Sequence, residues 1–137
     1  MMQIHSYLTF NGNCREAMTF YRDCLDGELS LRTIGESPMA DKLPLHMKQC
    51  ILHATLTKDA MVIMASDMVG EKGLIKGNSV SLMLNCSSED EIKATYALLS
   101  AEGEATHPLD NTFWGELSGD LTDKFGNHWL LHFDENQ

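Results

Sequence analysis

Long apolar runs and basic residues are both scarce in this sequence. No stretch approaches the roughly 18 uninterrupted apolar residues that a membrane-spanning helix needs, so we expect no membrane span. Ten lysines and arginines stand against 20 aspartates and glutamates, which gives a formal net charge of −10. Because that charge repels phosphate backbones and anionic lipids, we expect neither nucleic acid nor a membrane surface as a partner.

Cysteine is also sparse and widely spaced. No C-x-x-C pair is present, which excludes the usual spacing of a zinc knuckle or a redox dithiol. The first residues, MMQIHS, lack the basic stretch and apolar run of a secretory signal. We therefore expect a cytoplasmic protein with reduced thiols. The cysteines are Cys14, Cys24, Cys50 and Cys86.

The overall composition is that of an ordinary folded protein. Of the 137 residues, 43% are hydrophobic and 22% are charged, far from the composition of a disordered chain. At roughly 100–200 residues per domain, this length allows one domain or two small fused halves. About two thirds of the unfolded surface can be buried at this size, so a hydrophobic core is expected.

The first half of the chain has the pattern of a strand, a helix and three further strands. Asn13 and Glu16 have the capping-box spacing that opens a helix. Asp26-Gly27 is typical of a helix exit, where glycine tolerates a left-handed conformation. A turn around Lys58-Asp59 joins the last two strands. We expect strands at 3–10, 28–34, 50–57 and 60–66, and a helix that ends near Leu25.

The same order of elements recurs in the second half. Ser88 and Glu91 repeat the capping-box spacing, and Gly103 ends the second helix as Gly27 ends the first. Such internal similarity indicates a duplicated unit. We expect strands at 79–86, 104–109, 116–122 and 127–133, around a helix lined by Ile92, Tyr96 and Leu99.

The duplication predicts an α+β fold of two tandem β-α-β-β-β modules in one domain, with mixed sheets curved around a cleft. The first module covers residues 1–67, a linker 68–78 and the second module 79–137. Each helix covers one face of its own sheet, which leaves the opposite face for the cleft. Since interfaces between repeated halves are common ligand sites, the cleft is the predicted binding site.

Strand alternation predicts which side chains pack on a helix and which face the cleft. The residues expected to pack on the helices are Ile4, Leu8, Phe10, Val80, Leu82, Leu84, Trp129, Leu131 and Phe133. His53 is expected to share its face with Ile51 and Thr55. The cleft candidates are His5, Tyr7, His53, Asp67, Ser81, Trp114, His128 and His132.

These candidates have two open interpretations. Histidine titrates near neutral pH, so His5, His128 and His132 in one concavity could act in catalysis or hold a metal. They could equally be hydrogen-bonded polar residues of a partly wet sheet face, and His53 has the same two interpretations. Trp114 could form an aromatic wall for an apolar ligand or pack at a dimer seam.

Several segments taken together resemble a known family. They are LTFNGNCREA at 8–17, ILHA at 51–54, MASD at 64–67, TFWG at 112–115 and LTDKFG at 121–126. These segments are similar to the glyoxalase/bleomycin-resistance/dioxygenase (vicinal oxygen chelate) superfamily, in particular the branch labelled 3-demethylubiquinone-9 3-methyltransferase-like. The resemblance implies paired β-α-β-β-β modules, a small-molecule cleft and a homodimer.

The resemblance also allows a test for a metal site. The superfamily's metal enzymes bind a divalent ion through two histidines and two glutamates, one from each of four strands. His5 could serve on the first strand, and Asp67 is the carboxylate in roughly the right place on the fourth. The fifth strand has no imidazole at 79–81, and Leu130 stands where the last glutamate is expected. Because hard divalent ions need several oxygen or imidazole donors, we expect no inherited metal and no other cofactor.

The methyltransferase label has little support in the residues. Methyl transfer from S-adenosylmethionine normally uses a glycine-rich strand-to-helix turn in a parallel α/β sheet. The corresponding turn here, NGNC at 11–14, has a single glycine. We therefore do not expect methyl transfer.

These observations lead to one main hypothesis and two alternatives. The main hypothesis is a protein that binds an unidentified small molecule in the cleft without the superfamily metal. The first alternative is a metal-dependent lyase, isomerase or dioxygenase with a rearranged ligand set of His5, Asp67 and His128. The second is a regulatory partner without catalysis.

Overall fold

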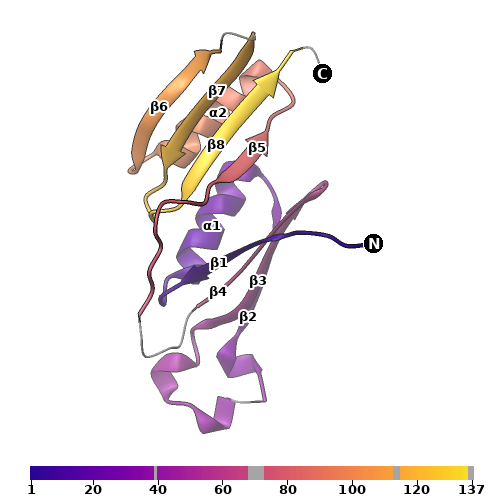
Figure 1. Ribbon diagram of the computed structural model, residues 1–137. Helices are drawn as coiled ribbons and strands as arrows, with labels where there is room; N and C mark the ends of the chain where they lie inside the picture. The colour runs from indigo at the N-terminus through magenta and orange to yellow at the C-terminus, as the bar shows by residue number, and fades with distance from the viewer. Residues whose placement is uncertain (39, 68–72, 113–114, 136–137) are drawn as a thin grey trace. The chain divides into compact units, whose positions relative to one another are not determined.

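The computed structural model describes residues 1–38, 40–67, 73–112 and 115–135. The chain forms two compact units, Met1–Ile75 and Lys76–Gln137, each with its own sheet and helix (Figure 1). The boundary between the units falls within 68–78, the segment interpreted above as a linker. Within the described ranges, neither helix is long and apolar enough to cross a membrane.

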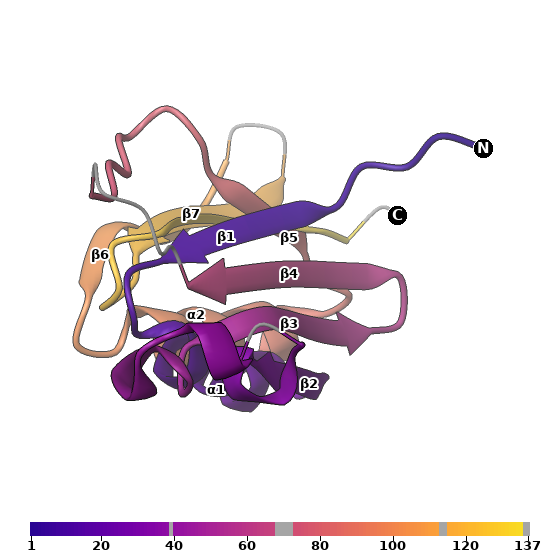
Figure 2. The same cartoon turned by 90° about the horizontal axis from the view of Figure 1, so that it is seen from below.

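Unit 1 packs one helix on a four-stranded mixed sheet, sheet A. The strand order is β1-β4-β3-β2, in which β1 and β4 are parallel and the other neighbours are antiparallel. Figure 2 shows β1, β4 and β3 side by side. The elements are β1 (Ser6–Phe10), α1 (Cys14–Leu25), β2 (Glu28–Thr33), β3 (Ile51–Lys58), β4 (Met61–Asp67) and short 3₁₀ turns at Ile34–Glu36, Ala40–Lys42 and Leu45–Met47.

Unit 2 repeats this arrangement in sheet B. The strand order is β5-β8-β7-β6, in which β5 and β8 are parallel and the other neighbours are antiparallel. The elements are β5 (Leu82–Asn85), α2 (Glu89–Ser100), β6 (Glu104–Asn111), β7 (Glu116–Thr122) and β8 (His128–Asp134). Because the two units share element order and sheet topology, the predicted α+β fold of two tandem β-α-β-β-β modules is confirmed.

Each core lies between the helix and one face of its sheet. In unit 1, Phe10, Tyr21 and Leu56 are fully buried. In unit 2, Ile92, Tyr96 and Leu99 of α2 are buried, as predicted, together with Trp129 and Leu131 of β8. Burying a large apolar side chain contributes about 1.5–3 kcal/mol, so these side chains supply much of the stability of each unit.

The predicted roles of the two helix-terminal glycines are wrong. The left-handed residue after α1 is Asp26, with φ of 56°, and its counterpart after α2 is Glu102, with φ of 62°. A Cβ on Gly27 would lie 2.9 Å from the Thr57 carbonyl oxygen, and one on Gly103 would lie 2.8 Å from the Asp123 carbonyl carbon. Both glycines therefore allow the chain to pass close to a strand backbone.

The two predicted capping boxes have different outcomes. Ser88 caps α2, because its hydroxyl oxygen accepts a 3.0 Å hydrogen bond from the backbone N–H of Glu91. The Glu91 carboxylate in turn accepts bonds from the backbone N–H and hydroxyl of Ser87. Asn13 makes no side-chain cap bond to α1, so that part of the prediction is wrong.

Two predicted strands begin later than expected. Ile4 is 97% exposed and Val80 is 74% exposed, because β1 begins at Ser6 and β5 at Leu82. Pairing of β5 starts opposite Trp129, so Val80 lies beyond the start of its partner strand. An apolar residue is buried by alternation only where a neighbouring strand and the helix continue past it.

An irregularity in the pairing of β2 with β3 changes a predicted face. Arg32 pairs with His53, but the next residue, Thr33, pairs with Ile51, which leaves Leu52 as an extra residue. Such a bulge reverses the alternation on one side of it. Ile51 is therefore buried while His53 is only half-buried, and the prediction that these two residues share a face is wrong.

Candidate functional site

Each sheet has a second face that the helix of its own unit does not cover. On sheet A this open face carries Tyr7 and His53, two of the predicted candidates. The Tyr7 hydroxyl donates a 2.8 Å hydrogen bond to the Ser66 hydroxyl oxygen. The His53 ring nitrogen Nε2 lies 3.1 Å from the Thr55 hydroxyl oxygen. These hydrogen bonds tie the two rings to neighbouring strand residues on the same face.

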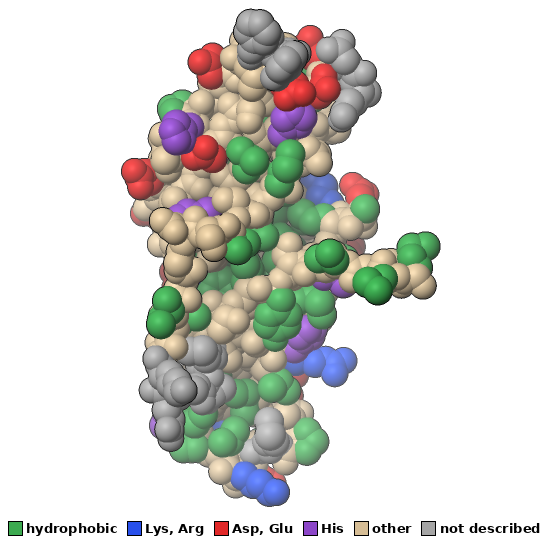
Figure 3. All heavy atoms as spheres, viewed as in Figure 1, with side chains coloured by type: hydrophobic (Ala, Val, Ile, Leu, Met, Phe, Trp, Pro, Cys, Tyr) green, Lys and Arg blue, Asp and Glu red, His purple; other side chains and the backbone are tan. Residues whose placement is uncertain are grey.

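The open face of sheet B has a polar row beside an apolar pair. Figure 1 shows this face with α2 behind the strands, and Figure 3 shows histidine, acidic and apolar side chains gathered on it. The register places Asn85 and Ser118 on either side of His132. It also places Met83 next to Leu130. The face therefore offers apolar contact and hydrogen-bonding groups within adjacent rows.

His132 is held by a carboxylate. Its ring nitrogen Nε2 lies 2.9 Å from Oε2 of Glu116, and the two side chains are 17% and 32% exposed. The pair is thus partly withdrawn from water. Its electrostatic interaction is therefore stronger than that of a fully exposed pair. Glu116 was not among the predicted candidates. Alternation along 116–122 could have found it, since Leu121 points to the helix side and Glu116 to the other.

His128 is also on the open face of sheet B, but its ring is engaged on both sides. Nδ1 lies 2.9 Å from the Thr122 hydroxyl oxygen, and Nε2 lies 3.4 Å from the Gly77 carbonyl oxygen. A carbonyl only accepts, so Nε2 carries the proton and Nδ1 accepts from the Thr122 hydroxyl. This arrangement leaves His128 without a free lone pair for a metal.

Asp67 is buried instead of facing a cleft. Its Oδ1 accepts 2.9 Å hydrogen bonds from the backbone N–H groups of Gly12 and Cys14, and its Oδ2 accepts a 2.7 Å bond from that of Ile51. The residue is 6% exposed. Burial, with a further contribution from the charge of Asp67, raises the pKa of the Cys14 thiol to about 12. Asp67 therefore joins the start of α1 to the start of β3.

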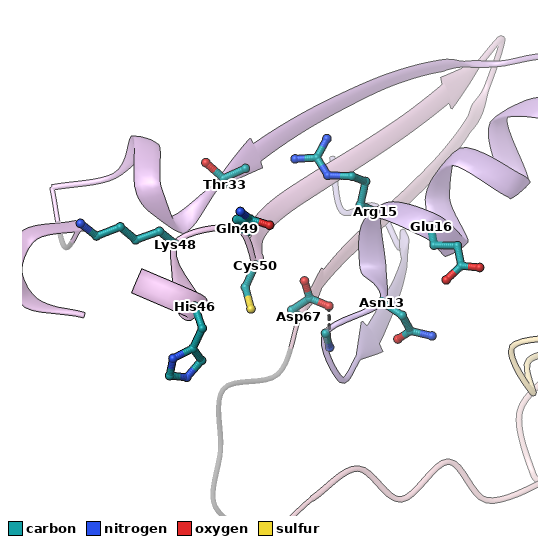
Figure 4. Close-up of a pocket in the computed structure, with 10 residues that line it drawn as sticks. Asn13, Arg15, Glu16, Thr33, His46, Lys48, Gln49, Cys50 and Asp67 are labelled. Atoms are coloured by element: carbon teal, nitrogen blue, oxygen red, sulfur yellow. Dashed lines mark hydrogen bonds between the residues drawn. The ribbon is translucent and has the colours of Figure 1, made fainter. Parts of the chain in front are cut away.

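A pocket of about 690 Å³ lies in unit 1 beside Asp67 and the start of α1. The side chain of Arg15 extends toward Thr33 and Gln49 across this pocket (Figure 4). Cys50 also lines it, and burial raises the pKa of the Cys50 thiol. The Asp67 carboxylate beside this pocket is 6% exposed and accepts three hydrogen bonds from backbone N–H groups.

Three predicted candidates lie outside the strands or the described residues. His5 precedes β1 and is exposed, and Ser81 precedes β5 and is exposed. Trp114 lies outside the residues that the structure describes. The strand argument that turned His5 and Ser81 toward a cleft therefore does not apply to them.

The residues do not fit the metal of the superfamily's enzymes. In the described ranges, no group of three His, Cys, Asp or Glu side chains is arranged to hold a metal ion. In the rearranged set, Asp67 uses its oxygens for three backbone N–H groups and His128 uses both ring nitrogens. Each of these two residues is thus already hydrogen-bonded within its own unit.

Comparisons with known proteins agree with this architecture. The chain is 30% identical to Protein YjdN of Escherichia coli (strain K12), over 99% of this chain and 98% of that protein. Protein PA1353 from Pseudomonas aeruginosa is 36% identical, with 98% of both chains covered and a TM-score of 0.83. A PhnB protein from Bacillus cereus, whose name includes 3-demethylubiquinone-9 3-methyltransferase, is 26% identical, with 97% and 100% covered and a TM-score of 0.78.

The family itself follows from a match along most of the sequence. Residues 3–131 match the model of the Glyoxalase/Bleomycin resistance protein/Dioxygenase superfamily. The match spans both units, and the repeated topology described above is the one that the resemblance of the motifs implied. The chain belongs to the glyoxalase/bleomycin resistance protein/dioxygenase superfamily.

Proposed function

We propose that this protein binds a small organic molecule on the open face of sheet B, without a divalent metal. The observation that carries the proposal is the apolar pair Met83 and Leu130 beside the polar row of Asn85, His132 and Ser118. Ligand sites are usually apolar surfaces with a few placed polar groups. Leu130, at the place of the superfamily's last glutamate, favours an apolar ligand group over an ion at this position.

The proposal includes a cytoplasmic homodimer. All four cysteines carry free thiols, which supports a reducing compartment. β1 and β5 are edge strands, and edge strands can pair with another chain. Sedimentation equilibrium tests the dimer: we expect twice the chain mass, and a single-chain mass at every concentration contradicts it.

Methionine methyl NMR tests ligand binding at this face. Met83 is 54% exposed on the open face, whereas Met18 of α1 is fully buried and serves as an internal control. With acetophenone and related aryl ketones as probes, we expect the Met83 methyl signal to shift and the Met18 signal to stay. A Met83 signal that no ketone moves contradicts the proposed site.

A charge substitution provides a matched control for the apolar pair. Leu130→Glu places a carboxylate beside Met83, which we expect to weaken ketone binding at least about tenfold because an ionised group must be desolvated. Leu98→Glu on the exposed side of α2 adds the same charge, since Leu98 is 49% exposed, and is expected to leave binding unchanged. Equal binding by both variants contradicts a ligand at Leu130.

Elemental analysis tests the metal-free part of the proposal. Protein purified without chelators or a histidine tag is expected to carry less than about 0.1 equivalent of nickel, zinc, iron or manganese, because no complete ligand set is found among the residues that the structure describes. About one equivalent per chain would favour the metal-dependent lyase, isomerase or dioxygenase instead.

A further inference from the structure

We infer that His132 and Glu116 form a metal-independent acid–base pair that removes a proton from a carbon acid bound against Met83 and Leu130. The inference rests on the proposed binding site and assigns a reaction to it. The reacting atom is Nδ1 of His132, and Glu116 acts through the imidazole ring as a positioning residue.

The contact with Glu116 determines which ring nitrogen can react. An ionised carboxylate only accepts hydrogen bonds, so the 2.9 Å contact between Oε2 and Nε2 places the ring proton on Nε2. Nδ1 then keeps its lone pair. Among the described residues, Nδ1 has no hydrogen-bond partner, and no buried side-chain nitrogen or oxygen lacks one. Nδ1 is therefore open to solvent and to a ligand.

The sheet register explains why the pair is oriented toward the open face. Ser118 is directly opposite His132 on β7, and Glu116 is two residues before Ser118 on the same face. Diagonal neighbours on one face are within reach of long side chains. The carboxylate thus approaches His132 along the sheet, from the side of β7.

The neighbouring residues suit a carbonyl compound with an apolar body. Met83 on β5 and Leu130 on β8 are paired neighbours, and Leu130 is two residues before His132 on the same face of β8. Asn85 and Ser118 flank His132 in the polar row, and their amide and hydroxyl groups are donors. Donors beside a developing oxyanion stabilise it.

The reaction balances without an oxidant, a reductant or a metal. Nδ1 takes the proton from the carbon next to the carbonyl, and the electron pair of the C–H bond moves to form the enolate. The imidazolium is stabilised by Glu116. Return of the proton to the other face of the same carbon regenerates neutral His132 and yields the racemised compound.

The other histidines of unit 2 lack this combination. Both ring nitrogens of His128 are engaged. His107 also has a carboxylate partner, Asp120, but its side chain is 76% exposed and so is not partly buried as that of His132 is. His107 is therefore a matched control: it is a histidine–carboxylate pair on the same sheet, and its side chain plays no part in the proposed site.

The test uses 5-nitrobenzisoxazole as a carbon-acid probe. A base removes its ring C–H proton, the N–O bond breaks, and the coloured 2-cyano-4-nitrophenolate forms. We expect the protein to exceed an equal concentration of imidazole at least about 100-fold, within the range of positioned general bases. His132→Gln is expected to abolish the excess, Glu116→Gln to lower it about tenfold, and His107→Gln to leave it unchanged.

Probe binding separates failure of the inference from failure of the proposed function. The Met83 methyl signal reports binding of the same probe in each variant, and its native position shows that the variant is folded. Binding with a rate equal to that of free imidazole overturns the inference alone. No shift of the Met83 signal overturns the proposed site as well. The assignment to His132 is overturned if folded His132→Gln eliminates the probe at the unsubstituted protein's rate. It is also overturned if His107→Gln lowers the rate as much as His132→Gln does.

Discussion

The carboxylate of Asp67 at the end of β4 accepts a 2.9 Å hydrogen bond from the backbone N–H of Cys14, the first residue of α1. The same carboxylate reaches Gly12 and Ile51. Asn13, the residue that the capping-box spacing indicates, makes no such bond. The start of α1 is therefore held by a residue 53 positions away in the sequence.

Replacing Asp67 is expected to destabilise unit 1. Asp67→Asn exchanges one acceptor oxygen for an NH₂ group that would face backbone donors, and hydrogen bonds to charged groups contribute about 1.5–3 kcal/mol each. We expect urea denaturation to show a loss of about 2–3 kcal/mol in the free energy of unfolding. Asp23→Asn, at an exposed position on α1, is the control and should change it by less than about 0.5 kcal/mol. Equal effects of the two variants would show that the three hydrogen bonds of Asp67 are unimportant.

The two helix starts should respond differently to alanine. Ser88→Ala removes the hydroxyl that caps α2 and is expected to lower the free energy of unfolding by about 1 kcal/mol. Asn13→Ala removes no cap bond from α1 and should cost less than about 0.5 kcal/mol. Urea denaturation of both variants measures the difference. A larger loss for Asn13→Ala would contradict the assignment of the α1 cap to Asp67.

The glycine after α2 should not tolerate a side chain. In Gly103→Ala the new Cβ would lie 2.8 Å from the carbonyl carbon of Asp123, so we expect a loss of about 1–3 kcal/mol in the free energy of unfolding. Glu102→Gly places glycine where φ is 62°, and should change stability by less than about 1 kcal/mol. If Glu102→Gly is the more damaging change, close backbone approach is not the reason for Gly103.

The cysteines should alkylate in a definite order. Burial, with a smaller effect of the charge of Glu91, raises the pKa of Cys86 to about 11, and the pKa of buried Cys14 is about 12. Because the thiolate is the reactive form, a raised pKa lowers reactivity at neutral pH and makes the rate rise about tenfold per pH unit below the pKa. The pKa of half-buried Cys50 is raised less than those of Cys14 and Cys86. We therefore expect iodoacetamide at about pH 7 to modify Cys50 before Cys14 and Cys86. Peptide mass spectrometry measures this order, and early modification of Cys14 in folded protein would contradict it.

Local patterns in the sequence were sufficient for the elements and for much of the core. The spacing of Ile92, Tyr96 and Leu99 predicted the buried face of α2, and Ser88 with Glu91 predicted its start. These predictions succeed because a helix and its cap are formed by residues within about one turn of each other. The family resemblance also rests on contiguous segments, which the match over 3–131 confirms.

The candidate site depended more on contacts that the linear pattern does not contain. Alternation predicted that His132 lies on the face opposite Trp129 and Leu131, as the burial pattern of β8 shows, but its pairing with Glu116 comes from the register of β7 against β8. The bulge at Leu52 and the late start of β5 were likewise invisible, since both follow from where a neighbouring strand begins or shifts.

By itself, the sequence determined the order of helices and strands, their duplication and the buried face of α2, because these depend on local periodicity. Only the tertiary structure decided what the polar candidates do. Asp67 serves the backbone of α1 and β3, His128 is bonded on both sides, and His132 keeps one nitrogen open. A polar side chain takes its role from the partners that folding brings within about 3 Å, and those partners come from distant parts of the chain.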